Sequence, residues 1–177
     1  MPAKSKKQIA AKNRESARRF SNSDIKFKED IAYLIKIWFM KINSNNRANI
    51  CRNLRNLLNR QVFYLENYSN DDTMKLDINF IKKNNWFVKN AECYYAHGKD
   101  SKKDEIALRE DLVRTGHKLI GNLTHELIHR IIVRIDKIND ADKYHSDRFP
   151  YWCERVYAKF NKALMNSTVN SKFPRIE

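Results

Sequence analysis

Apolar residues recur every three or four positions along much of this chain, and this spacing is typical of helices that bury one face. The first such run predicts a helix from Asp24 to about Met40, and a cluster of Asn and Ser at 43–46 predicts the turn that follows. A second predicted helix has its apolar face at Ile50, Leu54, Leu57, Leu58, Val62 and Leu65. The folded part of the chain is therefore expected to begin with two amphipathic helices.

The pattern of residues changes near residue 75, where short runs of aromatic and β-branched residues become frequent. Such runs are typical of strands. Strands are predicted at 76–81, 86–95 and 105–108, and the polar segment 98–104 is the expected loop of a hairpin.

Two further helices are predicted in the last third of the chain. The apolar face of the first is formed by Leu119, Ile120, Leu123, Leu127, Ile128, Ile131, Ile132 and Ile135. The second repeats apolar residues from Phe149 to Leu164, with Ser146 or Asp147 as its N-cap and Pro150 in its first turn, where proline is tolerated. The chain contains only three Gly and three Pro. Such a low content is more typical of long helices than of an all-β sandwich.

The length of 177 residues suits one domain with a sizeable core. We expect a disordered basic arm at 1–23, a folded domain at 24–165 and a flexible tail at 166–177. A transit peptide is the alternative for the arm, because it is rich in Lys, Arg and Ser and carries a single acid, Glu15.

The chain is strongly basic, with 35 Lys and Arg against 21 Asp and Glu, a net charge of +14. This excess favours a polyanionic partner, DNA or RNA, bound through a basic surface, and a generic basic protein is the alternative. The candidate contacts are Lys6, Lys7, Arg14, Arg18, Arg19, Arg47, Arg52, Arg55 and Arg60. Four of these arginines lie on the second predicted helix. The simpler interpretation is that they form a solvent-exposed face; the alternative is that they form a row that binds the phosphates of a nucleic acid.

Residues 13–19 look like the basic region of bZIP transcription factors. Phe20 stands where a small residue is expected, however, and no leucine heptads follow. We therefore keep only non-specific nucleic-acid contact for this segment. The aromatic residues of the strand region are expected in the core, with stacking of single-stranded bases as the alternative, for Trp86, Phe87, Tyr94 and Tyr95.

Cysteine usage and hydropathy indicate the compartment. Cys51, Cys93 and Cys153 lie far apart and form no CxxC pair, so free thiols in a reducing compartment are predicted. No run approaches the roughly 18 apolar residues that a membrane span needs. We expect an intracellular protein, nuclear or cytoplasmic, without a membrane partner.

Residues 125–129 read His-Glu-Leu-Ile-His within the third predicted helix. His125 and His129 then lie one turn apart on the same face, where two neutral imidazoles can hold a zinc ion. Glu126 is rotated about 100° from His125 and is placed to act as general base on a zinc-bound water. The alternative is a helix with two exposed histidines.

The third ligand distinguishes the classes of zinc enzyme. The metzincin spacing requires Gly at 132 and His at 135, and both positions are Ile, which excludes that class. His145 arrives after a polar loop at the start of the next helix and is a better candidate than Glu154, which falls inside that helix. Three protein ligands leave a fourth position for water, as in catalytic zinc sites. Solvent-facing positions are expected for His97 and His117, with a role as extra ligand as the alternative.

From about Cys93 to Val156, the chain resembles the SprT-like, or Spartan-like, zinc metallopeptidases. The first part of the likeness is the strand-like Ile106-Ala107-Leu108 and the run from Leu119 to Leu123, which leads into His125-Glu126-Leu127-Ile128-His129. The second part is His145-Ser146-Asp147-Arg148-Phe149, which is similar to the family's His-(Gly/Ser)-x-x-Phe at the start of a helix. The first 90 residues match the family weakly.

This resemblance implies an α+β fold of the minimal zincin type, with helices packed on a small, mainly antiparallel sheet and HExxH on a central helix. It implies one zinc ion per chain at His125, His129 and His145, and peptide-bond hydrolysis with Glu126 as the base. Eukaryotic members digest proteins crosslinked to DNA, so we expect nucleic-acid-bound protein substrates and a role in DNA repair. The alternative function is a non-catalytic nucleic-acid-binding protein with a structural zinc site.

Overall fold

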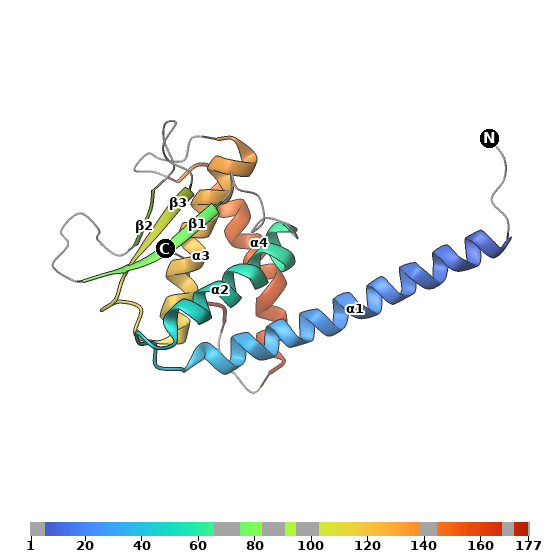
Figure 1. Ribbon diagram of the computed structural model, residues 1–177, viewed down its shortest axis with the longest axis horizontal. Helices are drawn as coiled ribbons and strands as arrows, with labels where there is room; N and C mark the ends of the chain where they lie inside the picture. The colour runs from blue at the N-terminus through green and yellow to red at the C-terminus, as the bar shows by residue number, and fades with distance from the viewer. Residues whose placement is uncertain are drawn as a thin grey trace.

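The computed structural model is α+β, and it describes residues 6–65, 75–82, 91–94, 103–138, 145–167 and 172–176. Its helices are α1 (Lys6–Trp38), α2 (Arg47–Leu58), α3 (Gly116–Ile131) and α4 (Arg148–Met165). A π-helical turn extends two of them, η1 (Asn59–Phe63) after α2 and η3 (Ile132–Asp136) after α3. The strands are β1 (Lys75–Ile81), β2 (Ala91–Tyr94) and β3 (Lys103–Arg109) (Figure 1).

The described strands form one small mixed sheet in the order β1-β3-β2. β1 runs parallel to β3 along its whole length, whereas β2 is antiparallel to β3. The antiparallel pairing of β2 with β3 agrees with the predicted hairpin, although residues 86–90 and 98–102 lie outside the described part of the chain. Asp104, expected in the loop, belongs to β3. A mainly antiparallel sheet is not confirmed. β3 lies in the centre, paired along both of its edges, and its Ile106 and Leu108 are fully buried.

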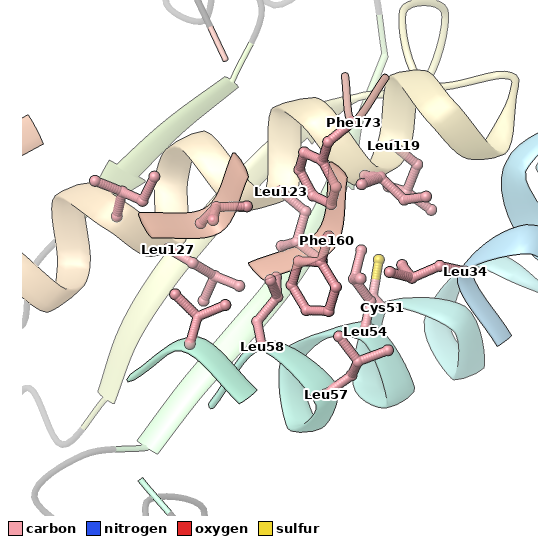
Figure 2. Close-up of a cluster of buried hydrophobic side chains, with 14 of the residues drawn as sticks. Leu34, Cys51, Leu54, Leu57, Leu58, Leu119, Leu123, Leu127, Phe160 and Phe173 are labelled. Carbon is pink, nitrogen blue, oxygen red and sulfur yellow. The ribbon is translucent and has the colours of Figure 1, made fainter. Parts of the chain in front are cut away.

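The core lies where α2, α3, α4 and the C-terminal half of α1 meet (Figure 2). Leu119, Leu123 and Leu127 follow one another at intervals of four along α3, so they form a single face, and each is at most 1% exposed. This face packs around Phe160 of α4. Burial of each such side chain stabilises the fold by about 1.5–3 kcal/mol relative to exposure. The packing fixes the rotation of α3 and therefore the direction of its polar face.

The disordered arm expected at 1–23 is not what the structure has, because residues 6–23 continue α1 as helix. The N-terminal half of α1 extends away from the rest of the chain (Figure 1). Ala, Lys and Arg are frequent in this segment, and no Gly or Pro interrupts residues 6–38. Helical propensity therefore continues the helix that the core begins. In the described ranges, no helix has the length together with the apolar character needed to cross a membrane.

The flexible tail expected at 166–177 is wrong for residues 172–176. Phe173 is only 2% exposed and stacks on Phe160 with ring centroids 5.6 Å apart. Tyr157 Oη donates a hydrogen bond to the carbonyl of Pro174 at 3.1 Å and accepts one from the amide of Ile176 at 2.9 Å. The burial of this one aromatic ring therefore anchors the end of the chain against α4.

Candidate metal centre

Two of the predicted ligands lie on one face of α3. His125 and His129 are half-buried, their Nε2 atoms are 3.0 Å apart, and their ring centroids are 4.7 Å apart. The opposite face of the helix is held in the core, so neither ring can turn inward. The motif therefore has the arrangement that its spacing predicts.

The third ligand comes from the segment that leads into α4. His145 is exposed, and its ring centroid lies 5.1 Å from that of His125 and 4.9 Å from that of His129. One ligand atom from each of the three histidines lies within 4.8 Å of the other two. Glu154, the alternative third ligand, is exposed on α4 and belongs to no such cluster among the described residues.

The spacing of the three imidazoles can be compared with that of a bound ion. Zinc–nitrogen bonds of about 2.0–2.1 Å in tetrahedral geometry place neighbouring nitrogens about 3.4 Å apart. The shortest separation of 3.0 Å and the upper limit of 4.8 Å bracket this value. Small rotations of the rings would therefore bring all three to one ion. Imidazole also suits copper, nickel and iron, so the geometry defines a ligand set and not the element.

An aromatic ring packs against all three histidines. Phe149 is 4% exposed, and its ring is stacked on that of His145 with centroids 3.8 Å apart. Its centroid lies 4.9 Å from that of His125 and 4.8 Å from that of His129. Periodicity identified Phe149 only as an apolar position of the last helix, because contact with three imidazoles is decided by tertiary structure.

The carboxylate of the motif lies beside the ligands. Glu126 is 4% exposed, and its Oε1 is 3.9 Å from Nε2 of His125. A carboxylate in this buried position lies where it can act on a water held by the neighbouring histidines. The predicted base and the three predicted ligands are thus brought together.

A buried ion pair attaches the motif helix to the sheet. Arg130, next to His129, is fully buried, and its Nε donates to Oδ2 of Asp104 on β3 at 2.7 Å. Arg134 donates to the same carboxylate. Burial and the neighbouring Arg134 lower the pKa of Arg130 to about 9, and it remains charged at neutral pH. The sequence offered no signal for this contact, since its partners lie far apart along the chain.

Three of the arginines proposed as nucleic-acid contacts on the second helix are engaged within the protein. Arg47 forms an ion pair with Glu110 at 2.9 Å, Arg60 binds Asp30, and Arg55 donates to the carbonyl of Leu76. Burial lowers the pKa of Arg55. The predicted stripe is therefore reduced, because these three side chains bind groups of the sheet region and of α1. Exposed side chains remain at Arg52 and Arg14, and the structure does not describe those of Lys6, Lys7, Arg18 and Arg19.

His117 lies away from the metal ligands, about 12 Å along α3 from His125 at 1.5 Å per residue. Its Nδ1 is 3.2 Å from Oγ1 of Thr115, and it lines a pocket of about 670 Å³ together with Trp38 and Phe173. It is not an extra ligand of this cluster. His97 lies outside the described residues.

Some other expectations concern residues outside the described part of the chain or side chains that it does not include. The aromatic residues considered for base stacking, Trp86, Phe87, Tyr94 and Tyr95, are all of this kind, so stacking stays a prediction.

Asp147 is the N-cap of α4, although no side-chain hydrogen bond caps the helix.

Cys51 and Cys153 are free thiols, as predicted. Burial raises the pKa of Cys51 to about 12 and that of Cys153 to about 11.

The chain matches no protein-family model and no curated protein. Its resemblance to SprT-like peptidases therefore depends on the residues quoted above. Its function has to be argued from the geometry of the histidine cluster and from the charge of the chain.

Proposed function

We propose that this protein is a zinc-dependent endopeptidase of the SprT-like type, acting on proteins bound or crosslinked to nucleic acid. The observation that supports this most strongly is the cluster of His125, His129 and His145 with the buried carboxylate of Glu126 beside it. The zincin fold belongs to the same proposal. It is supported by the position of α3, which carries His125 and His129 on one face and is attached to β3 through Arg130 and Asp104.

The three imidazoles would hold one zinc ion through one ring nitrogen each. When bound, zinc supplies Lewis acidity and lowers the pKa of a coordinated water towards about 7. Ligation requires neutral imidazoles, so protons compete with the ion and binding is expected to weaken in acid. Exposed His145 leaves the cluster open to solvent and substrate, which suits a catalytic site better than a closed structural one.

Glu126 would move the proton. Its Oε1 accepts a proton from the attacking water as the water oxygen bonds to the scissile carbonyl carbon. The carboxyl group of Glu126 then gives that proton to the amide nitrogen, and the carbon–nitrogen bond breaks. The products are an amine and a carboxylic acid, and the acid loses its remaining proton to solvent at neutral pH. Burial of Glu126 supports this role, because few surrounding waters compete for its oxygens.

The basic charge supports the choice of substrate. A net charge of +14 would hold the chain on a polyanion, and proteins attached to that polyanion would then be concentrated near the site. The projecting N-terminal part of α1 and exposed Arg52 are available for such contact. This attraction is electrostatic, so it should weaken steeply with added salt.

The test combines metal analysis with digestion of casein and histones, each with and without DNA. Glu126→Gln should retain bound zinc and lose at least about 100-fold of the activity. Glu154→Gln is the matched control, because it changes an exposed carboxylate on α4, and it should cleave at the wild-type rate.

If the protein binds zinc but shows no cleavage that is lost in Glu126→Gln, the peptidase proposal is wrong. That result would favour a non-catalytic protein with a structural zinc site. Cleavage that DNA leaves unchanged would remove only the nucleic-acid part of the proposal.

A further inference from the structure

The position of His145 is fixed in a different way from the positions of His125 and His129. His125 and His129 are held at a fixed separation by the hydrogen bonds of α3. His145 lies on a separate element, so its distance from them depends on how the start of α4 is fixed to the end of η3. A contact between these two helix ends would set the position of His145.

Such a contact is present at Asp136, the last residue of η3. Its Oδ2 accepts a hydrogen bond from Nε of Arg148 at 2.8 Å and a second from Nε1 of Trp152 at 2.9 Å. Arg148 is the first residue of α4, three positions after His145, and Trp152 lies one turn further on the same face. One carboxylate oxygen therefore joins the helix of His125 and His129 to the helix that follows His145.

Both ends of this contact are themselves restrained. Lys137, directly after Asp136, has a φ of 60° and ends the helix in the left-handed conformation. Trp152 is 7% exposed and packs edge-on against Phe63 with ring centroids 5.4 Å apart. The guanidinium of Arg148 lies 4.0 Å from the centre of the Tyr151 ring. The donors are thus held in place before they meet the carboxylate.

We propose that Asp136 is a positioning residue, which holds His145 at the distance from His125 and His129 that a shared metal ion requires. The proposal rests on the metal site of the proposed function and does not require peptidase activity. Asp136 touches none of the three histidines; it acts through Arg148, Trp152 and the first turn of α4. Phe149, in that same turn, carries the effect to the ring on which it stacks.

A general ion pair would stabilise the fold without any effect on the metal. Asp111 provides the matched control, since it pairs with Arg109 at 2.7 Å and its side chain is 20% exposed, against 14% for Asp136. Asp111→Asn and Asp136→Asn therefore remove similar carboxylates, of which only one joins the two histidine-bearing segments.

The experiment is a titration of the metal-free full chain with Co²⁺, with the visible absorption of the ion recording its coordination. Asp136→Asn should weaken Co²⁺ affinity about tenfold or more, the lower end of the effect of removing outer-shell partners. Its spectrum at saturation should approach that of His145→Ala. Asp111→Asn should bind within about twofold of wild type, with the wild-type spectrum. If Asp136→Asn does not fold, Trp152→Phe removes one of the two donors while it keeps a packed ring, and it should show the same direction of change.

The proposal is overturned if the Asp136 and Trp152 variants bind Co²⁺ with wild-type affinity and spectrum. It is also overturned if Asp111→Asn weakens binding equally. A wild-type chain that binds no Co²⁺ would overturn the metal site itself, and with it this proposal. Tight Co²⁺ binding without proteolysis would overturn only the proposed peptidase activity, because the titration measures the position of the ligands and does not depend on cleavage.

Discussion

Gly116 begins the helix that carries the metal ligands, and the end of α1 passes directly against it. A Cβ atom at this position would lie 1.6 Å from the carbonyl oxygen of Ile37 and 2.6 Å from its carbonyl carbon. Both are backbone atoms, so no side-chain rotation can make room. Gly116→Ala must therefore displace either the end of α1 or the start of α3.

The loss of stability can be calculated from the hydrogen bonds that this displacement breaks. The amide of Gly116 donates to the carbonyl of Met40 at 2.9 Å, and that of Ile42 donates to the carbonyl of Arg114 at 2.8 Å. Each of these hydrogen bonds contributes about 0.5–1.5 kcal/mol, and overpacking costs about 1–3 kcal/mol more. Alanine regains at most about 1 kcal/mol of helical propensity. The free energy of unfolding should fall by about 1–6 kcal/mol.

Gly121, in the same helix, supplies the control. A Cβ atom there would meet Cβ of Pro174 at 3.2 Å, a contact that a shift of a few tenths of an ångström relieves. Gly121→Ala is therefore expected to stay within about 1 kcal/mol of wild type, since propensity offsets the tight contact. Urea unfolding, followed by circular dichroism, gives both values. Equal stability of the two variants would refute the close packing of α1 on α3.

Three further predictions test the packing elsewhere. In a Cys93→Ser background at pH 8, iodoacetamide should modify folded Cys51 about 1000-fold and Cys153 about 100-fold more slowly than the urea-unfolded chain, because raised thiol pKa values deplete the thiolate; the folded rate should keep rising with pH towards 11–12, and equal rates would contradict their burial. Lys137→Gly should raise the free energy of unfolding by about 0.5 kcal/mol, since glycine adopts φ of 60° without strain, and a loss of stability in urea would contradict this. Phe173→Ala should lower it by about 3–5 kcal/mol, whereas a freely moving tail would give no change.

The motif helix was predictable from sequence because its stabilising pattern is local. Leu119, Leu123 and Leu127 define the buried face by spacing alone, and the same periodicity directs His125 and His129 away from it. His145 could be identified for a related reason. It precedes a second periodic run, so the sequence itself placed it at the start of a helix.

The arm and the tail were predicted incorrectly because composition does not record what the chain packs against. Residues 6–23 read as a solvated basic segment, yet they continue a helix whose other end lies in the core. The tail carries a single buried ring, Phe173, and one aromatic residue gives no periodic signal.

The sequence alone determined the amphipathic helices of the core and identified the three histidines and Glu126, because these depend on residue type and on spacing within one element. Only the tertiary structure decided that β1 pairs parallel with β3, that Arg60 binds Asp30, and that Phe149 lies against the histidines. Contacts of this kind join residues distant in sequence, and each forms only when the whole core has set the two elements side by side. The position of His145 relative to α3 belongs to this second group.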